Sequence, residues 1–168
     1  MIRIIFLCLT FLSIVPFLSA QSFPRDWEGK WEGTVEIWTN NQKTDAFPMS
    51  LTIQPNDTAW EYTIHYGREY QGKPDIRRYA LVEVNDSTGH YVIDEQNSIY
   101  LDAYLNGPCL YSPFGAMNSE LMSRICLEGD VMHYEVTSQI GEPVRGSGGQ
   151  VVEGDTMLSI RSYQVTLV

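Results

Sequence analysis

Basic residues are scarce in this chain. It has 11 lysines and arginines against 21 aspartates and glutamates, which gives a formal net charge of -10 at pH 7. Nucleic acids and anionic membrane surfaces carry phosphate groups that attract basic proteins. Neither is therefore expected as a partner, and the acidity is interpreted as keeping the protein in solution.

Long hydrophobic runs are also missing, apart from one at the N-terminus. There the apolar run Ile4 to Leu18, at about 15 residues, is shorter than the roughly 20 that cross a bilayer. Ser19 and Ala20 then offer the small residues that a signal-peptidase site requires. We predict that residues 1–20 are a cleaved signal peptide and that residues 21–168 form one domain. The protein is expected to be secreted or periplasmic, with no stable membrane anchor.

Cysteine is limited to three residues, and Cys8 would be lost with the signal peptide. Cys109 and Cys126 remain, and an even number of cysteines in an oxidising compartment predicts one disulfide. Two separately buried thiols are the alternative. Neither cysteine has a second cysteine or a histidine at ligand spacing, and the oxygen-rich segment Asp94 to Asn97 matches no established calcium loop. No metal site is predicted.

Several sequence motifs and one periodicity are absent. The chain has no Gly-x-Ser-x-Gly, His-Glu-x-x-His, phosphate-binding loop or dinucleotide fingerprint, so hydrolase, metalloprotease and nucleotide-binding classes lack support. After the signal segment, no window of about eleven residues has a helical period. Without room for helical crossovers, a parallel sheet is excluded as the main element.

Alternation of apolar and polar residues is what the chain has instead, and it is typical of half-buried antiparallel strands. Turn sequences follow these segments at Asn56-Asp57, at Asn85 to Gly89 and at Glu128-Gly129-Asp130, where Asn, Asp and Gly favour tight turns. Two regions read differently: Asn106 to Asn118 predicts a longer loop, and Thr156 to Leu167 predicts a closing strand. The clearest apolar faces take every second residue of Trp31 to Ile37, Phe47 to Ile53, Trp60 to Tyr66 and Ile99 to Leu105.

Consecutive antiparallel strands must either leave two open edges or close on themselves, and closure removes the edges. We therefore predict an all-β fold, a single antiparallel meander β-barrel of about eight to ten strands. A β-sandwich is the alternative. This many strands can close around the space for one small ligand.

The start of the first strand resembles a known superfamily. Gly29-x-Trp31-x-Gly33, together with the chain length and the strand order, resembles the calycins: lipocalins, fatty-acid-binding proteins and nitrobindin-like barrels. Fatty-acid-binding proteins place two helices where this chain has only the loop Thr39 to Asp45, so the lipocalin-like and nitrobindin-like branches fit better. In lipocalins the tryptophan plugs the closed end of the barrel beneath an arginine, which implies structural roles for Trp31 and Arg161.

Nitrobindin-like proteins hold a heme through a histidine late in the chain. Here the histidines are His65, His90 and His133, and none lies within Thr156 to Val168. Each of them also falls on the polar face of its predicted strand. We predict no cofactor, while heme bound through a tyrosine stays open as an alternative.

Aromatic residues dominate the predicted interior, where they either fill the barrel or line an amphipathic pocket. The candidate ligand-binding residues in this group are Trp60, Tyr62, Tyr66, Tyr91 and Tyr134.

Arg78 is a further candidate for the interior. By parity with Ala80 and Val82 it is expected to point inward, whereas Arg77 points outward. An inward arginine could bind the carboxylate of an amphipathic ligand, or it could form an internal ion pair with a residue such as Glu95.

Three functions follow from this interpretation. The first is an exported, lipocalin-like binding protein for a small apolar or amphipathic molecule. The second is a filled barrel that acts as a cell-envelope or surface interaction protein without a small ligand. The third is an enzyme that uses carboxylates and tyrosines at the barrel mouth. The sequence sets no oligomeric state.

Overall fold

The computed structural model describes residues 22–141, 143–148, 159–162 and 165–167, so the predicted signal peptide lies outside it. Within this part the fold is all-β, with two short 3-10 turns, η1 (Arg25–Trp27) and η2 (Asp86–Thr88). The strands are β1 (Gly29–Thr39), β2 (Gln42–Pro55), β3 (Trp60–Tyr70), β4 (Lys73–Asn85), β5 (His90–Asp94), β6 (Tyr100–Asn106), β7 (Cys109–Ala116), β8 (Ser119–Glu128), β9 (Val131–Ile140), β10 (Arg145–Gly148), β11 (Ser159–Ser162) and β12 (Val165–Leu167).

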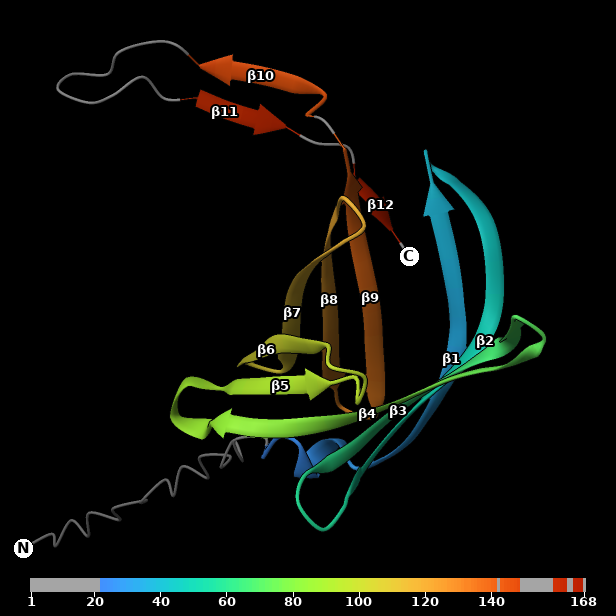
Figure 1. Cartoon of the computed structure of the whole chain (residues 1–168), viewed down its shortest axis with the longest axis vertical. Helices are drawn as coiled ribbons and strands as arrows, with labels where there is room; N and C mark the ends of the chain where they lie inside the picture. Colours follow the sequence, from blue (N-terminus) through green and yellow to red (C-terminus); the bar gives the residue numbers. More distant parts are fainter. Residues whose placement is uncertain (1–21, 142, 149–158, 163–164, 168) are drawn as a thin grey trace, which may run out of the picture.

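Strands β1 to β9 form an antiparallel meander that curves into a barrel (Figure 1). Each strand pairs with the next along the chain, and β12 lies between β9 and β1. The closure is short, because β12 pairs with β9 over three residues and with β1 through the single pair Trp38 and Leu167. The predicted meander barrel is confirmed, in a nearly closed form.

The predicted alternation places the core correctly in most strands. In β2, Phe47, Met49, Leu51 and Ile53 are all buried, while the residues between them are more exposed. The same pattern in β1, β3, β5 and β6 supplies the other inward faces. These half-buried strands need one apolar face each, which is why period-two patterning predicts them.

η1 lies at the end of the barrel that is at the bottom of Figure 1, and a group of aromatic residues beside it belongs to the core. The rings of Phe23 and Trp27 meet edge to face at 4.7 Å, and those of Phe23 and Tyr91 do so at 4.8 Å. Trp31 joins them by donating a hydrogen bond from Nε1 to the Trp27 carbonyl oxygen at 3.0 Å. The residues before the first strand are therefore part of the core.

The prediction of a long loop over Asn106 to Asn118 is wrong, because β7 occupies most of it. The turn before β7 is tight, with Gly107 at a φ of 60°. Proline is normally excluded from central strands because it lacks an N–H. β7 tolerates Pro113 because its pairing with β6 ends at Tyr111, so the strand has a free edge there among the described pairings.

The predicted closing strand Thr156 to Leu167 is only partly confirmed. Its last residues form β12, but β11 pairs with β10 in a separate two-stranded sheet. β10 lies before this segment, in a glycine-rich stretch of the chain. Residues 149–158 and 163–164 lie outside the described part.

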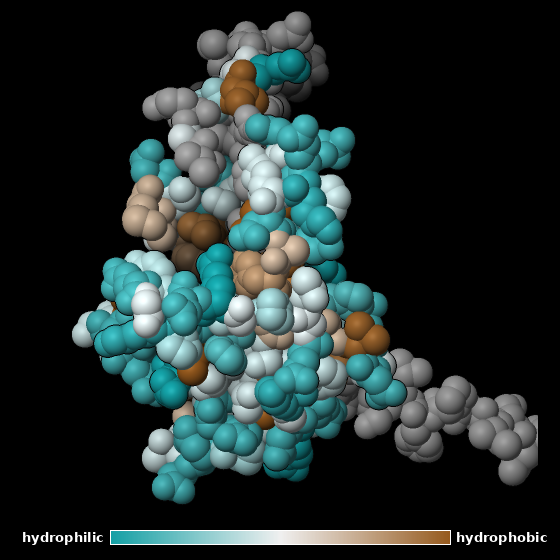
Figure 2. Space-filling model, turned by 90° about the vertical axis from the view of Figure 1, so that its right-hand side faces the viewer, coloured by the Kyte–Doolittle hydropathy of each residue, from teal (hydrophilic) through white to brown (hydrophobic). Residues whose placement is uncertain are grey.

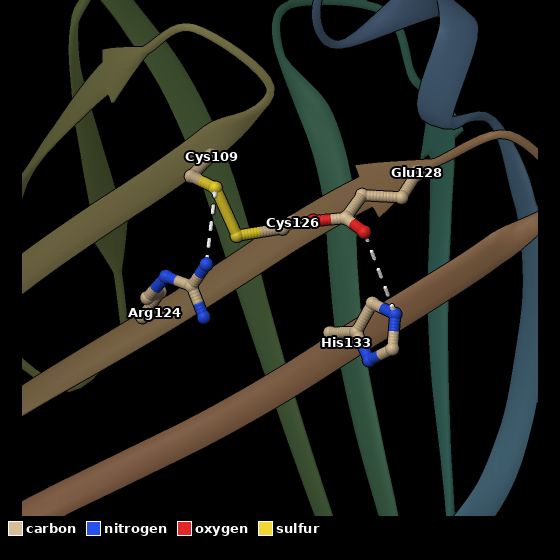
Figure 3. Close-up of a disulfide and its surroundings, with 5 residues drawn as sticks. All are labelled: Cys109, Arg124, Cys126, Glu128 and His133. Atoms are coloured by element: carbon tan, nitrogen blue, oxygen red, sulfur yellow. Dashed lines mark hydrogen bonds and ion pairs between the residues drawn. A yellow bond between two sulfur atoms is a disulfide. The ribbon is translucent and has the colours of Figure 1, made fainter.

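The predicted disulfide between Cys109 and Cys126 is confirmed, and the alternative of two free thiols is wrong (Figure 3). The two residues are paired directly across β7 and β8, with Cα atoms 4.1 Å apart. Their neighbours Leu110 and Ile125 point into the core, so the bond lies on the outward side of the sheet, where both cysteines are nevertheless buried, at 5% and 0% exposure. Arg124 Nη2 lies 3.8 Å from Cys109 Sγ.

Candidate binding site in the barrel

Four tyrosines gather inside the barrel from three strands: Tyr62 and Tyr66 on β3, Tyr79 on β4 and Tyr134 on β9. The rings of Tyr62 and Tyr79 stack with centroids 6.3 Å apart. The side chains of Tyr66 and Tyr134 lie close enough to influence each other's ionisation. Because β3 and β9 are not neighbours in the sheet, this approach is across the interior.

Burial extends the pH range over which these tyrosines stay neutral. It raises the pKa of Tyr62, Tyr66 and Tyr134 above the usual value of a phenol, and it raises the pKa of Tyr79 to about 12. A neutral phenol both donates and accepts hydrogen bonds. The group can therefore bind a polar ligand atom without introducing charge into the apolar interior.

A charged group lies beside the tyrosines. Asp75 is only 6% exposed, and its Oδ1 accepts a hydrogen bond from Arg77 Nε at 2.8 Å. Arg68 Nε lies 3.9 Å from the other carboxylate oxygen, and its guanidinium stacks 4.3 Å from the centre of the Phe47 ring. The two arginines pair with one buried carboxylate, and Glu95 also lies close enough to act on Tyr79, so positive and negative charges are matched around this end of the site.

The inward placement of Arg78 is wrong. Arg78 is exposed and pairs in register with Thr63, on the polar face of β3. The inward face of β4 instead carries Asp75, Tyr79 and Leu81. Arg77, which was expected to point outward, lies on this same face, in register with the buried Ile64. Arg78 lies close enough to Glu61 on the outer face for their charges to interact.

A cavity of about 410 Å³ opens into the interior between β1 and β9. We call the gap between these two strands the seam. The cavity has an apolar inner wall and an acidic rim, the latter formed by Glu32, Glu36 and Asp130. The inner wall consists of Trp31, Val35, Met49, Leu51, Met132 and Tyr134.

The surface around the β1 and β2 side of the molecule is largely hydrophilic, with isolated hydrophobic patches (Figure 2). Gly33, also on the cavity wall, has open space where a side chain would start, with no atom within 4 Å of an added Cβ. At Gly33 the cavity is therefore bounded by backbone alone, and no side chain fills the space beside it.

The predicted inward positions of Trp60, Tyr62, Tyr66, Tyr91 and Tyr134 are confirmed by their burial or their packing against the core. Of these five predicted residues, only Tyr134 lines the cavity itself. Tyr66 lies beside Tyr134 across the interior, and Tyr91 belongs to the aromatic group at the end beside η1.

Trp31 forms part of the cavity wall as well as packing on the core. The backbone of Arg161 lies in β11, but its side chain lies outside what the structure describes. The predicted stacking of Arg161 on Trp31 therefore stays a prediction.

Sequence reasoning missed Asp75, Met49 and Met132 as site residues. Asp75 is odd-numbered, whereas the inward face predicted for this strand took the even-numbered residues Arg78, Ala80 and Val82. Met49 falls on the predicted inward face of Phe47 to Ile53, and Met132 shares the parity of Tyr134, but nothing in a single sequence indicates that the seam beside them is open.

Comparison of the chain with protein-family models, with curated proteins and with solved structures finds no match in any of the three. The barrel is compatible with a calycin-like fold, and this compatibility rests on its strand order alone. Among the described residues, no helix is long and apolar enough to cross a membrane.

The raised pKa values make a prediction for alkaline solution. A phenol whose pKa is higher in the folded state favours folding fully below about pH 10, and this contribution is lost as the pH rises toward the folded value. We therefore expect the buried tyrosines to ionise together with unfolding, as seen by tyrosinate absorbance and circular dichroism in parallel. Tyr134→Phe should reduce the late part of the absorbance change. Complete ionisation of every tyrosine while the barrel is still folded would contradict the buried group.

Proposed function

We propose that this protein is an exported, calycin-like carrier that binds a small amphipathic molecule inside the barrel. The cavity is the observation that carries the proposal, because its volume of about 410 Å³ falls within the range of about 300 to 1,000 Å³ that is common for small-molecule sites. Export is supported by the disulfide, which is typical of oxidising compartments.

The chemistry of the walls supports an amphipathic ligand. The apolar body of such a molecule would pack against Val35, Leu51 and Met132, where burial of carbon surface favours binding. Its polar end would face the hydroxyls of Tyr134 and Tyr66, beyond which lie Asp75 and its two arginines. Neutral hydroxyls favour a group at that end that both donates and accepts hydrogen bonds, such as a hydroxyl.

Native mass spectrometry tests whether the protein carries such a molecule. The mature protein, purified from its own exported source, is measured before and after mild organic extraction. We expect an additional bound mass that is lost on extraction. The extracted protein should then bind the neutral fluorophore N-phenyl-1-naphthylamine, whose emission rises in an apolar site. A bare protein mass together with no rise in emission would show that the barrel is filled in solution and would overturn the proposal.

Filling the cavity from Gly33 should abolish this binding. In Gly33→Phe the new side chain starts in open space, and an aromatic residue suits a strand, so the fold should be retained. We expect the affinity for N-phenyl-1-naphthylamine to fall by about tenfold or more, which corresponds to about 1.4 kcal/mol. Gly146→Phe is the matched control, because Gly146 on β10 also has open space and lies outside the barrel. Equal affinities in the two variants would place the fluorophore elsewhere.

A further inference from the structure

The seam is a place where the sheet of the barrel is incomplete. β12 enters it and pairs with both walls, since Leu167 has Thr137 of β9 and Trp38 of β1 as its partners. At that level one strand fills the space between β9 and β1. The two walls run parallel to each other and antiparallel to β12, so a strand that continued the path of β12 would pair with both.

Among the residues that the structure describes, no strand pairs with either wall beyond Leu167. In the described pairings, residues 29–37 of β1 pair only with β2, and residues 131–136 of β9 pair only with β8. The free edge of a strand presents N–H and C=O groups that an additional strand can bind. Here two such edges border one cavity, so a single added strand would satisfy both.

The side chains along the seam indicate what kind of strand fits. Toward the interior, Val35 and Met132 offer apolar contacts, and toward solvent Glu32, Glu36 and Asp130 form an acidic rim. Glu32 and Glu36 pair with Lys30 and Lys43 on the surface, and exposed pairs of this kind are worth at most about 1 kcal/mol. Basic side chains of an incoming strand can therefore replace them.

We propose that the seam binds an extended segment of a partner protein in which apolar and basic residues alternate, and that this segment completes the barrel as an added strand. Its apolar side chains point to the cavity and its basic side chains meet the acidic rim. The alternation follows from strand geometry, which sends successive side chains to opposite faces. The net charge of -10 attracts such a segment from a distance. The added strand would also cover the side opening of the cavity, and it would do so whether or not a small molecule occupies the interior.

Fluorescence anisotropy with short synthetic peptides tests this proposal. The probe is a fluorescein-labelled peptide that alternates lysine and valine, and the first control alternates glutamate and valine. The second control repeats the lysine peptide with every second backbone amide N-methylated, which removes hydrogen-bond donors and keeps the charge. We expect binding of the unmodified lysine peptide alone. Equal binding of the N-methylated peptide, or no binding of any peptide, would overturn the added strand.

Protein variants and hydrogen exchange place the peptide. Glu32→Lys with Glu36→Lys should weaken peptide binding by about tenfold at low salt and by less at high salt, where exposed charges are screened. Glu83→Lys, an exposed change on β4, should leave it unchanged. Amides of β1 and β9 should gain protection from exchange when the peptide binds. Protection of those amides without peptide, in a dimer detected by ultracentrifugation, would overturn the partner named here in favour of a second copy. N-phenyl-1-naphthylamine binding is read separately, so failure of either proposal leaves the other measurable.

Discussion

Replacing Trp27 with alanine is expected to lower the free energy of unfolding by about 3 to 5 kcal/mol, as is typical when a large aromatic side chain is removed from a core. Trp27 is 1% exposed and is the largest of the fully buried side chains. Its ring supports Phe23, which in turn packs edge to face on Tyr91. The substitution would leave a cavity at the end of the barrel that η1 closes.

A matched substitution separates packing from hydrogen bonding at this position. Trp27 Nε1 is buried and has no hydrogen-bond partner among the described residues, and a buried donor without a partner costs about 1 to 3 kcal/mol. Trp27→Phe removes that donor and keeps an aromatic ring, so we expect it to cost less than half as much as Trp27→Ala. Urea unfolding followed by circular dichroism measures both. Equal losses in the two variants would show that the ring does not stabilise this end of the barrel.

The hydrogen bond from Trp31 Nε1 to the Trp27 carbonyl should survive both substitutions, because it uses the backbone of Trp27. Trp31 lies on the cavity wall, so the Phe variant should bind N-phenyl-1-naphthylamine as the parent protein does. A change in stability without a change in affinity would show that the end of the barrel and the cavity are separate in function.

The sequence predicted the inward faces wherever a strand has one apolar and one polar side. In β2 the apolar residues occupy one parity from Phe47 to Ile53, and all of them are buried. In β4 the run Tyr79-Ala80-Leu81-Val82 is apolar on both parities, so alternation has no information there. The larger side chains, Tyr79 and Leu81, pack into the core. Arg78 lies on the opposite parity and therefore faces outward.

Composition misled the prediction at β7. Two prolines and two glycines between Asn106 and Asn118 indicate a loop by the usual rules. The structure satisfies them differently, with Gly107 in the turn and Pro113 where β7 has no neighbour on its β6 side. Whether a proline lies at a free edge depends on the lengths of the neighbouring strands, which the local sequence does not contain.

The seam is the part of the candidate site that sequence reasoning could least predict. Its walls are the first strand and the ninth, and the space between them depends on how few residues of β12 enter. Alternation in β1 and β9 predicted which side chains face inward. It could not predict that residues 29–37 would pair only with β2 in the described part of the chain, because pairing between distant strands leaves no local pattern.

Removing the disulfide through Cys109→Ala with Cys126→Ala should lower the free energy of unfolding by about 3 kcal/mol. The bond closes a segment with a sequence separation of 17, and the entropy that it removes from the unfolded chain has about this value. For a domain of this size the melting temperature should fall by roughly 5 to 10 °C. The bond holds the end of the β7 and β8 hairpin that lies furthest from its turn.

Reduction of the parent protein supplies the control for this variant. Both cysteines are buried, so the parent is unfolded in urea with a phosphine reductant and refolded in the reductant. Its melting temperature should then fall toward that of the double variant, and the same treatment should leave the variant unchanged. Because the bond lies on the outer face, the folded variant should bind N-phenyl-1-naphthylamine with unchanged affinity. A stable variant that has lost this affinity would contradict the argument, since it would mean that the cross-link shapes the interior instead of limiting the unfolded chain.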